Sequence, residues 1–259
     1  LEAALASLGR HVPRARRVSP EEIARRVPAI RSGYAAAGIL DEEARDLDVA
    51  ARLQGFLRGC KARGGRLATG QRVARLVRAA GHWEVAAGSE AITANVVVDA
   101  AGAWADRVAV LAGLAPLGLV PRRRTALIVP PPAGHEVADW PVVDDLDEQF
   151  YFRPDAGRLF CSPADETAFE PCDVQPDELD IAIAVERVER AIELAVRRIE
   201  ARWAGLRTFA PDRTPVVGFD PRAPGFFWLA GQGGYGIQTA PALSALAASL
   251  VLGRALGPP

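Results

Sequence analysis

The sequence contains no methionine and very little cysteine or histidine, with three residues of each of the latter two. Cys60, Cys161 and Cys172 are widely separated, and the sequence has no C-x-x-C pair or Cys/His cluster with metal-ligand spacing. The histidines are isolated as well. We therefore predict no metal site, assign the histidines no chemistry, and expect a reduced, cytoplasmic setting.

Long apolar runs and runs of like charge are also lacking. No stretch reaches the roughly 18 to 20 apolar residues that span a bilayer, and no basic-then-apolar signal segment opens the sequence. The formal net charge is −1, and the acidic and basic residues are too interspersed to form a nucleic-acid-binding patch. These absences predict small-molecule partners, no transmembrane segment and no nucleic-acid partner.

Residues 1–8 read as the middle of a helix. Because methionine is absent as well, we expect a further segment to precede Leu1.

The residues that are present predict a mixed α/β protein. About half of the 259 residues are apolar (49%), which is enough for one large domain or two modest ones. A capping box at Ser19 to Glu22 predicts a short helix, and an apolar stripe from Val49 to Cys60 predicts a helix that buries one face. The other expected elements are strands at 72–78, 82–87, 95–100 and 226–230, an antiparallel sheet within 122–163, and helices at 104–111, 176–203 (one long or two in tandem) and from the glycine turn to about 252.

A glycine-rich turn follows the last predicted strand. Gly231, Gly233 and Gly236 match G-x-G-x-x-G literally, but a dinucleotide fingerprint needs a second strand and an acidic residue roughly 20 positions later, and neither follows. The turn can still present backbone amides and a helix dipole to an electron-rich group such as a flavin ring. The alternative is a packing turn whose glycines serve only positive φ angles.

Two segments resemble a known family. Residues 96–105, Val-Val-Val-Asp-Ala-Ala-Gly-Ala-Trp-Ala, resemble the "VVNAAGAWA" strand and turn of FAD-dependent oxidoreductases of the D-amino-acid oxidase (DAO) family. The W-x-G-L-R segment of that family corresponds to Trp203 to Arg207, and its glycine turn to Gly231–Gly236. Segments 170–176, 225–228 and 232–239 are most similar to the bacterial D-arginine dehydrogenases of this family.

The resemblance implies FAD as cofactor and assigns residues to it and to the substrate. Arg124, Tyr151 and Arg207 fall on the motifs that bind the substrate carboxylate, and Gly234 is assigned to the catalytic site with them. The residues implied to contact FAD are Val73 near the adenosine half, Ala100, Gly102 and Trp104 along the cofactor, Gly205 on the same face, and Gly233, Gly234, Tyr235, Gly236, Ile237 and Gln238 around the ring end.

The chemistry of these side chains fits that role, since guanidinium pairs bidentately with carboxylate and a phenol adds one directional donor. Each also has a structural alternative. Residues 122–124 could form a solvated basic turn, Tyr151 could be a core aromatic, and Arg207 could be a surface ion pair.

The implied fold is α/β, with an N-terminally truncated, Rossmann-like FAD/NAD(P)-binding layer and an antiparallel-sheet substrate domain. We expect the FAD-binding domain at 45–115 and 206–259, the substrate domain at 116–205, and residues 1–44 with the substrate domain. The implied activity is oxidation of a D-amino acid, resembling D-arginine, to the imino and then the 2-oxo acid by hydride transfer to flavin N5, with a separate electron acceptor. Two alternatives remain: a sarcosine- or glycine-type amine oxidase on the same fold, or a non-catalytic remnant without flavin.

Overall fold

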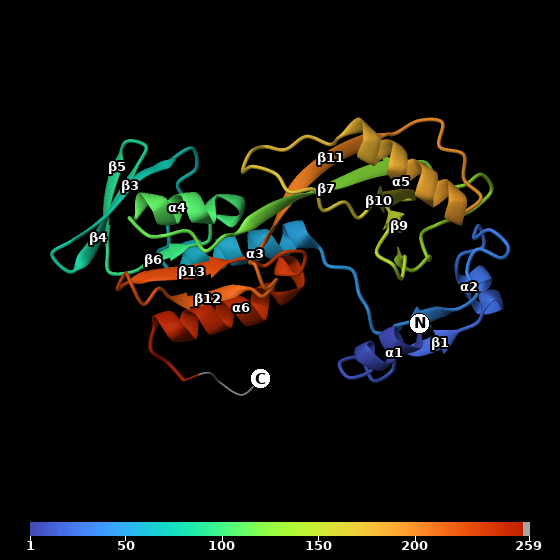
Figure 1. Ribbon diagram of the computed structural model, residues 1–259, viewed down its shortest axis with the longest axis horizontal. Coiled ribbons are helices and arrows are strands. Elements are labelled where there is room, and N and C mark those ends of the chain that lie inside the picture. Colours follow the sequence, from blue (N-terminus) through green and yellow to red (C-terminus); the bar gives the residue numbers. More distant parts are fainter. Residues whose placement is uncertain (256–259) are drawn as a thin grey trace. The chain divides into compact units, whose positions relative to one another are not determined.

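The structure is a computed structural model that describes residues 1–255, and it divides into two compact units (Figure 1). Unit 1 comprises Leu1–Arg45, Arg123–Thr167 and Asp173–Gly205, and unit 2 comprises Asp46–Arg122, Ala168–Cys172 and, among the described residues, 206–255. Two strands, β7 (Val120–Val129) and β11 (Ala201–Phe209), each have residues in both units.

Unit 1 is built on an antiparallel sheet with the strand order β11-β7-β10-β9-β8. The remaining strands of this sheet are β8 (Val143–Asp144), β9 (Tyr151–Asp155) and β10 (Arg158–Ser162). The other elements of unit 1 are α1 (Glu2–Leu8), β1 (Arg16–Val18), α2 (Pro20–Arg26), β2 (Gly38–Leu40) and α5 (Glu178–Ala191). Strands β1 and β2 form a separate antiparallel pair.

The two faces of the large sheet differ because side chains alternate along each strand. Cys161 pairs with Leu127 and Phe152, and all three are buried on the face covered by α5, whose Ala184 and Val188 join the same core (Figure 1). The opposite face carries Phe160, Tyr151 and Arg153. The ring of Phe160 stacks on Tyr151 at 5.8 Å between centroids and meets the ring of Trp203 at 5.6 Å.

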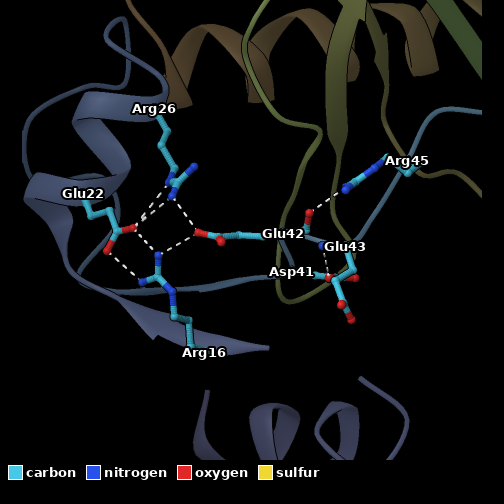
Figure 2. A network of polar contacts seen from close by, with 7 residues as sticks. All are labelled: Arg16, Glu22, Arg26, Asp41, Glu42, Glu43 and Arg45. Atoms are coloured by element: carbon cyan, nitrogen blue, oxygen red, sulfur yellow. Dashed lines mark hydrogen bonds and ion pairs between the residues drawn. The ribbon is translucent and has the colours of Figure 1, made fainter. Parts of the chain in front are cut away.

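A surface network of ion pairs ties together the N-terminal elements of unit 1 (Figure 2). Arg16 of β1 and Arg26 of α2 both contact Glu22 and Glu42 at 2.7 to 3.3 Å. Arg16, helped by Arg26, lowers the pKa of Glu22 to about 2. Since these side chains are solvent-accessible, the network fixes the geometry of this segment more than it stabilises the fold.

Unit 2 contains a small three-stranded sheet with the order β12-β13-β6. Its other sheet is the antiparallel three-stranded meander β3-β4-β5. Its elements are α3 (Val49–Ala62), β3 (Val73–Ala79), β4 (His82–Ala87), β5 (Glu90–Ala94), β6 (Val97–Asp99), the 3-10 helix η1 (Gly102–Trp104), α4 (Ala105–Leu111), β12 (Val216–Phe219), β13 (Phe226–Ala230) and α6 (Gly236–Val251). Strand β13 is antiparallel to β12 and parallel to β6.

Strand β13 is the centre of the unit 2 core because Phe226, Trp228 and Ala230 are buried with Trp83 of the meander and residues of α4. The indole Nε1 of Trp228 donates to Asp220 Oδ2 at 3.0 Å. The same carboxylate accepts from Arg222, through Nη2 at 2.6 Å and Nε at 2.9 Å. Asp220 is therefore a buried, fully used carboxylate, and these donors, Arg222 foremost, hold its pKa far below the ordinary value.

Several elements expected from the sequence are present. The Ser19 hydroxyl accepts from Glu22 N and caps α2. Strands β3, β4, β6 and β13 lie where apolar or alternating runs predicted them. The mixed α/β fold class with antiparallel sheets is confirmed.

Two expectations about helices were wrong. The helix predicted over 176–203 ends at Ala191, because Ile192 has extended backbone and bridges Ile30, and residues from Ala201 enter strand β11. Helix α3 forms, but no residue of it is buried, and Val49, Leu53 and Phe56 are each about half exposed. Its apolar stripe therefore has no cover within the described residues.

Residues 1–255 include no helix that combines the length and apolar content needed to cross a bilayer. The same residues contain no group of three or more His, Cys, Asp or Glu side chains arranged to hold a metal ion.

Replacing Asp220 tests the buried carboxylate. Asp220→Ala leaves the Trp228 indole N–H without its acceptor, and we expect the free energy of unfolding at pH 7 to fall by about 2–4 kcal/mol. Because the folded pKa of Asp220 is depressed, its contribution is present above pH about 4 and is lost as pH falls towards the folded value. Urea unfolding should show the difference narrowing below pH 4. The control is Asp212→Ala, which changes an exposed turn. A pH-independent difference would contradict the assignment.

Candidate functional site

Two turns lie at one edge of the small sheet in unit 2. In the parallel pair, Val97 aligns with Phe226 and Asp99 with Trp228, so both strands end at the same edge. The turn from Ala100 to Gly102 follows β6, and the glycine-rich turn 231–235 follows β13. In open α/β sheets, ligands bind beyond the carboxyl ends of such parallel strands. This edge is therefore the candidate cofactor site.

The turn after β6 is held by a buried acid. Asp99 is 2% exposed, and its Oδ1 accepts from Ala101 N at 3.1 Å. Gly102 then has φ +57° and opens η1, while Trp104 at the end of η1 is exposed. Asp99 Oδ2 is buried with no hydrogen-bond partner among residues 1–255. Burial raises the pKa of Asp99 to about 6, and the nearby Asp106 adds to the shift.

The glycine turn is packed against the end of β11. Gly233 N donates to Thr208 O at 2.8 Å. Phe209 forms an isolated antiparallel β-bridge with Gln232. A Cβ at position 233, where φ is +55°, would lie 2.5 Å from Phe209 Cε1. A Cβ at Gly231 would lie 3.4 Å from Ala210 in a backbone with φ +72°. Packing and positive φ together account for these two glycines.

Arg207 reaches the same turn. A Cβ at Gly234 would lie 2.9 Å from Nη1 of Arg207, so the guanidinium lies directly against the glycine backbone. Arg207 is partly buried. Within residues 1–255 its guanidinium has no ion pair and no hydrogen bond. The structural alternative for Arg207, an ordinary surface ion pair, is therefore not found among residues 1–255.

The first turn of α6 borders the candidate site. Tyr235 is its N-cap residue and makes no side-chain hydrogen bond to the helix, so the amides of Gly236, Ile237 and Gln238 have no side-chain cap. Arg52 Nη1 donates to Ile237 O at 2.7 Å. Tyr235 and Ile237 are both exposed. This uncapped helix start offers donors to an electron-rich group.

The residues expected to bind the substrate from unit 1 have different surroundings. Tyr151 lies on the aromatic face of the large sheet, with its ring on Phe160, and its hydroxyl has no hydrogen-bond partner in residues 1–255. Arg124 is already paired with Glu166 at 3.2 Å, and both side chains are largely buried. The neighbouring Arg123 is 8% exposed and pairs with Asp180 at 2.7 Å. Residues 122–124 thus belong to strand β7 rather than to a solvated turn.

The structure brings most of the predicted residues of unit 2 to one edge. Ala100 and Gly102 lie in the turn after β6. Residues 233–238 lie in the glycine turn and the first turn of α6, and Arg207 packs against Gly234. Val73 is the first residue of β3 and pairs with Ala87, so it belongs to the meander instead. Gly205 lies in β11 within unit 1, with open space at its Cα.

Sequence reasoning missed two residues of this edge. Asp99 is the last residue of a buried strand just before a glycine turn, and that position was the available signal. Phe209 lies two residues after Arg207 on the same strand, so alternation places both on one face of β11.

Two clefts of unit 1 contain none of the predicted site residues. One, of about 770 Å³, is lined by Arg26, Asp41, Glu42 and Trp140 among others. Another, of about 390 Å³, lies beside Glu166 and Arg187. Their lining residues mix both charges and include none of the predicted site residues, so neither cleft identifies the site.

The family model described as FAD dependent oxidoreductase (DAO) matches residues 1–250. The chain belongs to this family. FAD, expected from the sequence motifs, is confirmed as the cofactor that defines it.

Relatives and solved structures agree with this family. "FAD-dependent oxidoreductase domain-containing protein 1" of Bos taurus is 26% identical over 275 residues, covering 91% of this chain and 56% of the relative. The structure of L-proline dehydrogenase from P. horikoshii superposes with a TM-score of 0.81 at 22% identity, covering 94% of this chain and 66% of that one. Glycine oxidase from Geobacillus kaustophilus gives 0.80 at 20% identity, covering 98% and 69%. The chain thus spans little more than half of the bovine relative, and the two structures show a shared fold.

The residues present fit the ring end of a flavin better than its phosphates. The helix start without a side-chain cap, the two positive-φ turns and Asp99 Oδ2, which has no partner in the described part of the chain, all lie at one sheet edge. The literal G-x-G-x-x-G does not act as a fingerprint here, because Phe209 and Arg207 occupy the space beside Gly233 and Gly234.

The pKa of Asp99 makes a testable prediction about stability. A carboxyl whose folded pKa is raised to about 6 disfavours folding once ionised, so the free energy of unfolding should fall as pH rises from about 4 to about 6. We expect that fall to be about 2–3 kcal/mol and to vanish in Asp99→Asn, the residue of the family motif. Urea unfolding across this range measures the slope. Glu84→Gln, on the exposed side of β4, is the matched control and should leave the slope unchanged.

Proposed function

We propose that this chain forms the substrate-binding and flavin-ring-binding part of an FAD-dependent amino-acid oxidoreductase that oxidises a D-amino acid. The observation that carries the proposal is the Arg207 guanidinium, held against Gly234 at the candidate cofactor edge and without an ion-pair partner among residues 1–255. A partly buried cation kept without an internal carboxylate is a site for an external one.

Arg207 would bind the substrate carboxylate and thereby fix the α-carbon. A fork of two parallel N–H donors sets both the position and the orientation of a carboxylate. Holding a reactant in this way supplies several kcal/mol of a bimolecular barrier. When bound, the flavin supplies the acceptor for the hydride that leaves the α-carbon. The amine also loses a proton, and water converts the resulting imine to the 2-oxo acid and ammonia.

Tyr151 is the second proposed carboxylate ligand, and Arg124 is the weaker third. The Tyr151 hydroxyl has no internal partner among the described residues, which supports a role towards a ligand. Arg124 already pairs with Glu166, so a substrate carboxylate would have to share or displace that partner.

Residues at the edge of unit 2 would hold the cofactor. We assign Ala100, Gly102 and Trp104 to one side and Gly233 to Gln238 to the other. The assignments of Val73, which belongs to the meander, and of Gly205, which lies in unit 1, rest on the sequence resemblance alone. The division of the chain near residues 45 and 205 supports a FAD-binding domain at 45–115 and 206–259 and a substrate domain at 1–44 and 116–205.

The D-amino-acid class comes from the sequence motifs, which are most similar to D-arginine dehydrogenases. The names of the two similar structures, L-proline dehydrogenase and glycine oxidase, indicate that one fold serves secondary and primary amines. D-arginine is therefore the first substrate to test, with sarcosine and glycine as the competing class.

A visible absorption spectrum, followed by anaerobic addition of substrate, tests this proposal. We expect a flavin spectrum that bleaches with D-arginine or another D-amino acid and not with the L-enantiomer. Bleaching only by sarcosine or glycine would replace the D-amino-acid proposal with the amine oxidase. A colourless protein that takes up no added FAD would identify a non-catalytic remnant. Rapid reoxidation by air would identify an oxidase in place of the dehydrogenase favoured by the motifs.

Substituting Arg207 separates substrate binding from cofactor binding. In the flavin-loaded protein, Arg207→Ala should raise the substrate KM roughly 10- to 100-fold, since a charge-assisted hydrogen bond contributes about 1.5–3 kcal/mol. Flavin content should not change. Arg202→Ala, on the same strand and paired with Glu178 at the surface, is the control and should keep the KM of the wild type. An unchanged KM in Arg207→Ala would remove this residue from the site.

A further inference from the structure

Three residues at the end of β11 each pack against one glycine of the glycine turn. Arg207 lies against Gly234, Phe209 against Gly233, and Ala210 against Gly231. Backbone contacts lock the same register, since Gly233 N donates to Thr208 O and Phe209 bridges Gln232. A shift of the strand by one residue would break every one of these matches.

Phe209 has the largest of the three side chains that pack against the glycine turn. It is 5% exposed, and its ring lies so close to Gly233 that a methyl group there would be 2.5 Å from Cε1 and 2.8 Å from Cδ1. The guanidinium of Arg213 lies 4.1 Å from the ring centroid. The ring is therefore held between a cationic side chain and bare backbone, with little freedom to move.

Arg207 and Phe209 lie on the same face of β11 because side chains alternate along a strand. A ring fixed against Gly233 consequently fixes how the strand face presents Arg207 to Gly234. Gly233 and Gly234 are adjacent, so the two contacts share one peptide unit of the turn.

We propose that Phe209 is a positioning residue, whose ring sets the glycine turn against β11 so that Arg207 is held at Gly234 in the orientation that receives a carboxylate. This inference rests on the proposed function, in which Arg207 is a carboxylate ligand. Phe209 itself touches neither substrate nor cofactor in this role.

The test uses the flavin-loaded protein and acetate as a carboxylate probe, whose dissociation constant is measured from the perturbation of the flavin spectrum. Phe209→Ala should raise the acetate constant and the substrate KM about 10-fold while kcat and flavin content change less than 2-fold, a loss of about 1.4 kcal/mol in carboxylate binding. Phe209→Tyr keeps the ring and should restore the wild-type constants. Phe219→Ala removes an aromatic ring on β12 and should leave the acetate constant unchanged.

Gly233 supplies a second, independent readout. Gly233→Ala places a methyl group on the Phe209 ring and should lower the urea unfolding midpoint. Adding Phe209→Ala removes the obstacle, so the loss in the double variant should be smaller than the sum of the losses in Gly233→Ala and Phe209→Ala. Additive losses would show that the ring and the turn are not coupled and would overturn the proposal.

The outcomes distinguish this inference from the proposed function. If the wild type binds acetate, Arg207→Ala abolishes that binding and Phe209→Ala leaves it unchanged, the positioning role fails while the proposed function stands. If the wild type and Arg207→Ala bind acetate equally, the carboxylate role of Arg207 fails, and the positioning role fails with it.

Discussion

The candidate site depends on one short parallel pairing, that between β6 and β13. Only three residue pairs form it, from Val97–Phe226 to Asp99–Trp228, yet it directs both strands to the same edge, and so brings two turns that are about 130 residues apart in the sequence to one place. Strand β13 is held in the core of unit 2, because its aromatic side chains are buried and the Trp228 indole donates a hydrogen bond to Asp220. Burying apolar side chains contributes most of the energy here, since each large side chain contributes about 1.5–3 kcal/mol.

The second constraint is that β11 ends against the glycine turn. Its backbone supplies the acceptor for Gly233 N, and its side chains fill the space where the glycines have no Cβ. The turn is therefore shaped from within the chain before any ligand binds. A site preorganised in this way does not have to order itself on binding, and this lowers the entropic cost of holding a substrate. The cation of Arg207 gains its orientation from the same packing.

The sequence predicted what depends on local pattern. The buried runs at 95–100 and 226–230 are strands β6 and β13, the capping box at Ser19 opens α2, and the motifs identified the family and its cofactor.

The features that sequence reasoning missed depend on contacts between residues distant in the sequence. Helical periodicity continued past Ala191, but the bridge between Ile192 and Ile30 turned the chain into extended structure. The apolar stripe of α3 was expected to be buried, but helical spacing says only that a stripe exists and not what covers it. Arg124 matched a motif, yet its ion pair with Glu166 could not be read from residue types.

The glycine turn shows why a literal motif needs its structural context. Gly231, Gly233 and Gly236 have the spacing of a dinucleotide fingerprint, where bare backbone admits a pyrophosphate. In this fold the bare backbone at Gly233 admits Phe209, and that at Gly234 admits Arg207, so intramolecular packing already uses the space that the motif would give to phosphates. These glycines therefore serve the packing of β11 and the candidate site at the same time. The absence of two Cβ atoms lets a strand bring a guanidinium that is unpaired within residues 1–255 to the backbone of a turn at a sheet edge. A larger residue at Gly234 would displace that cation, and one at Gly233 would displace the Phe209 ring.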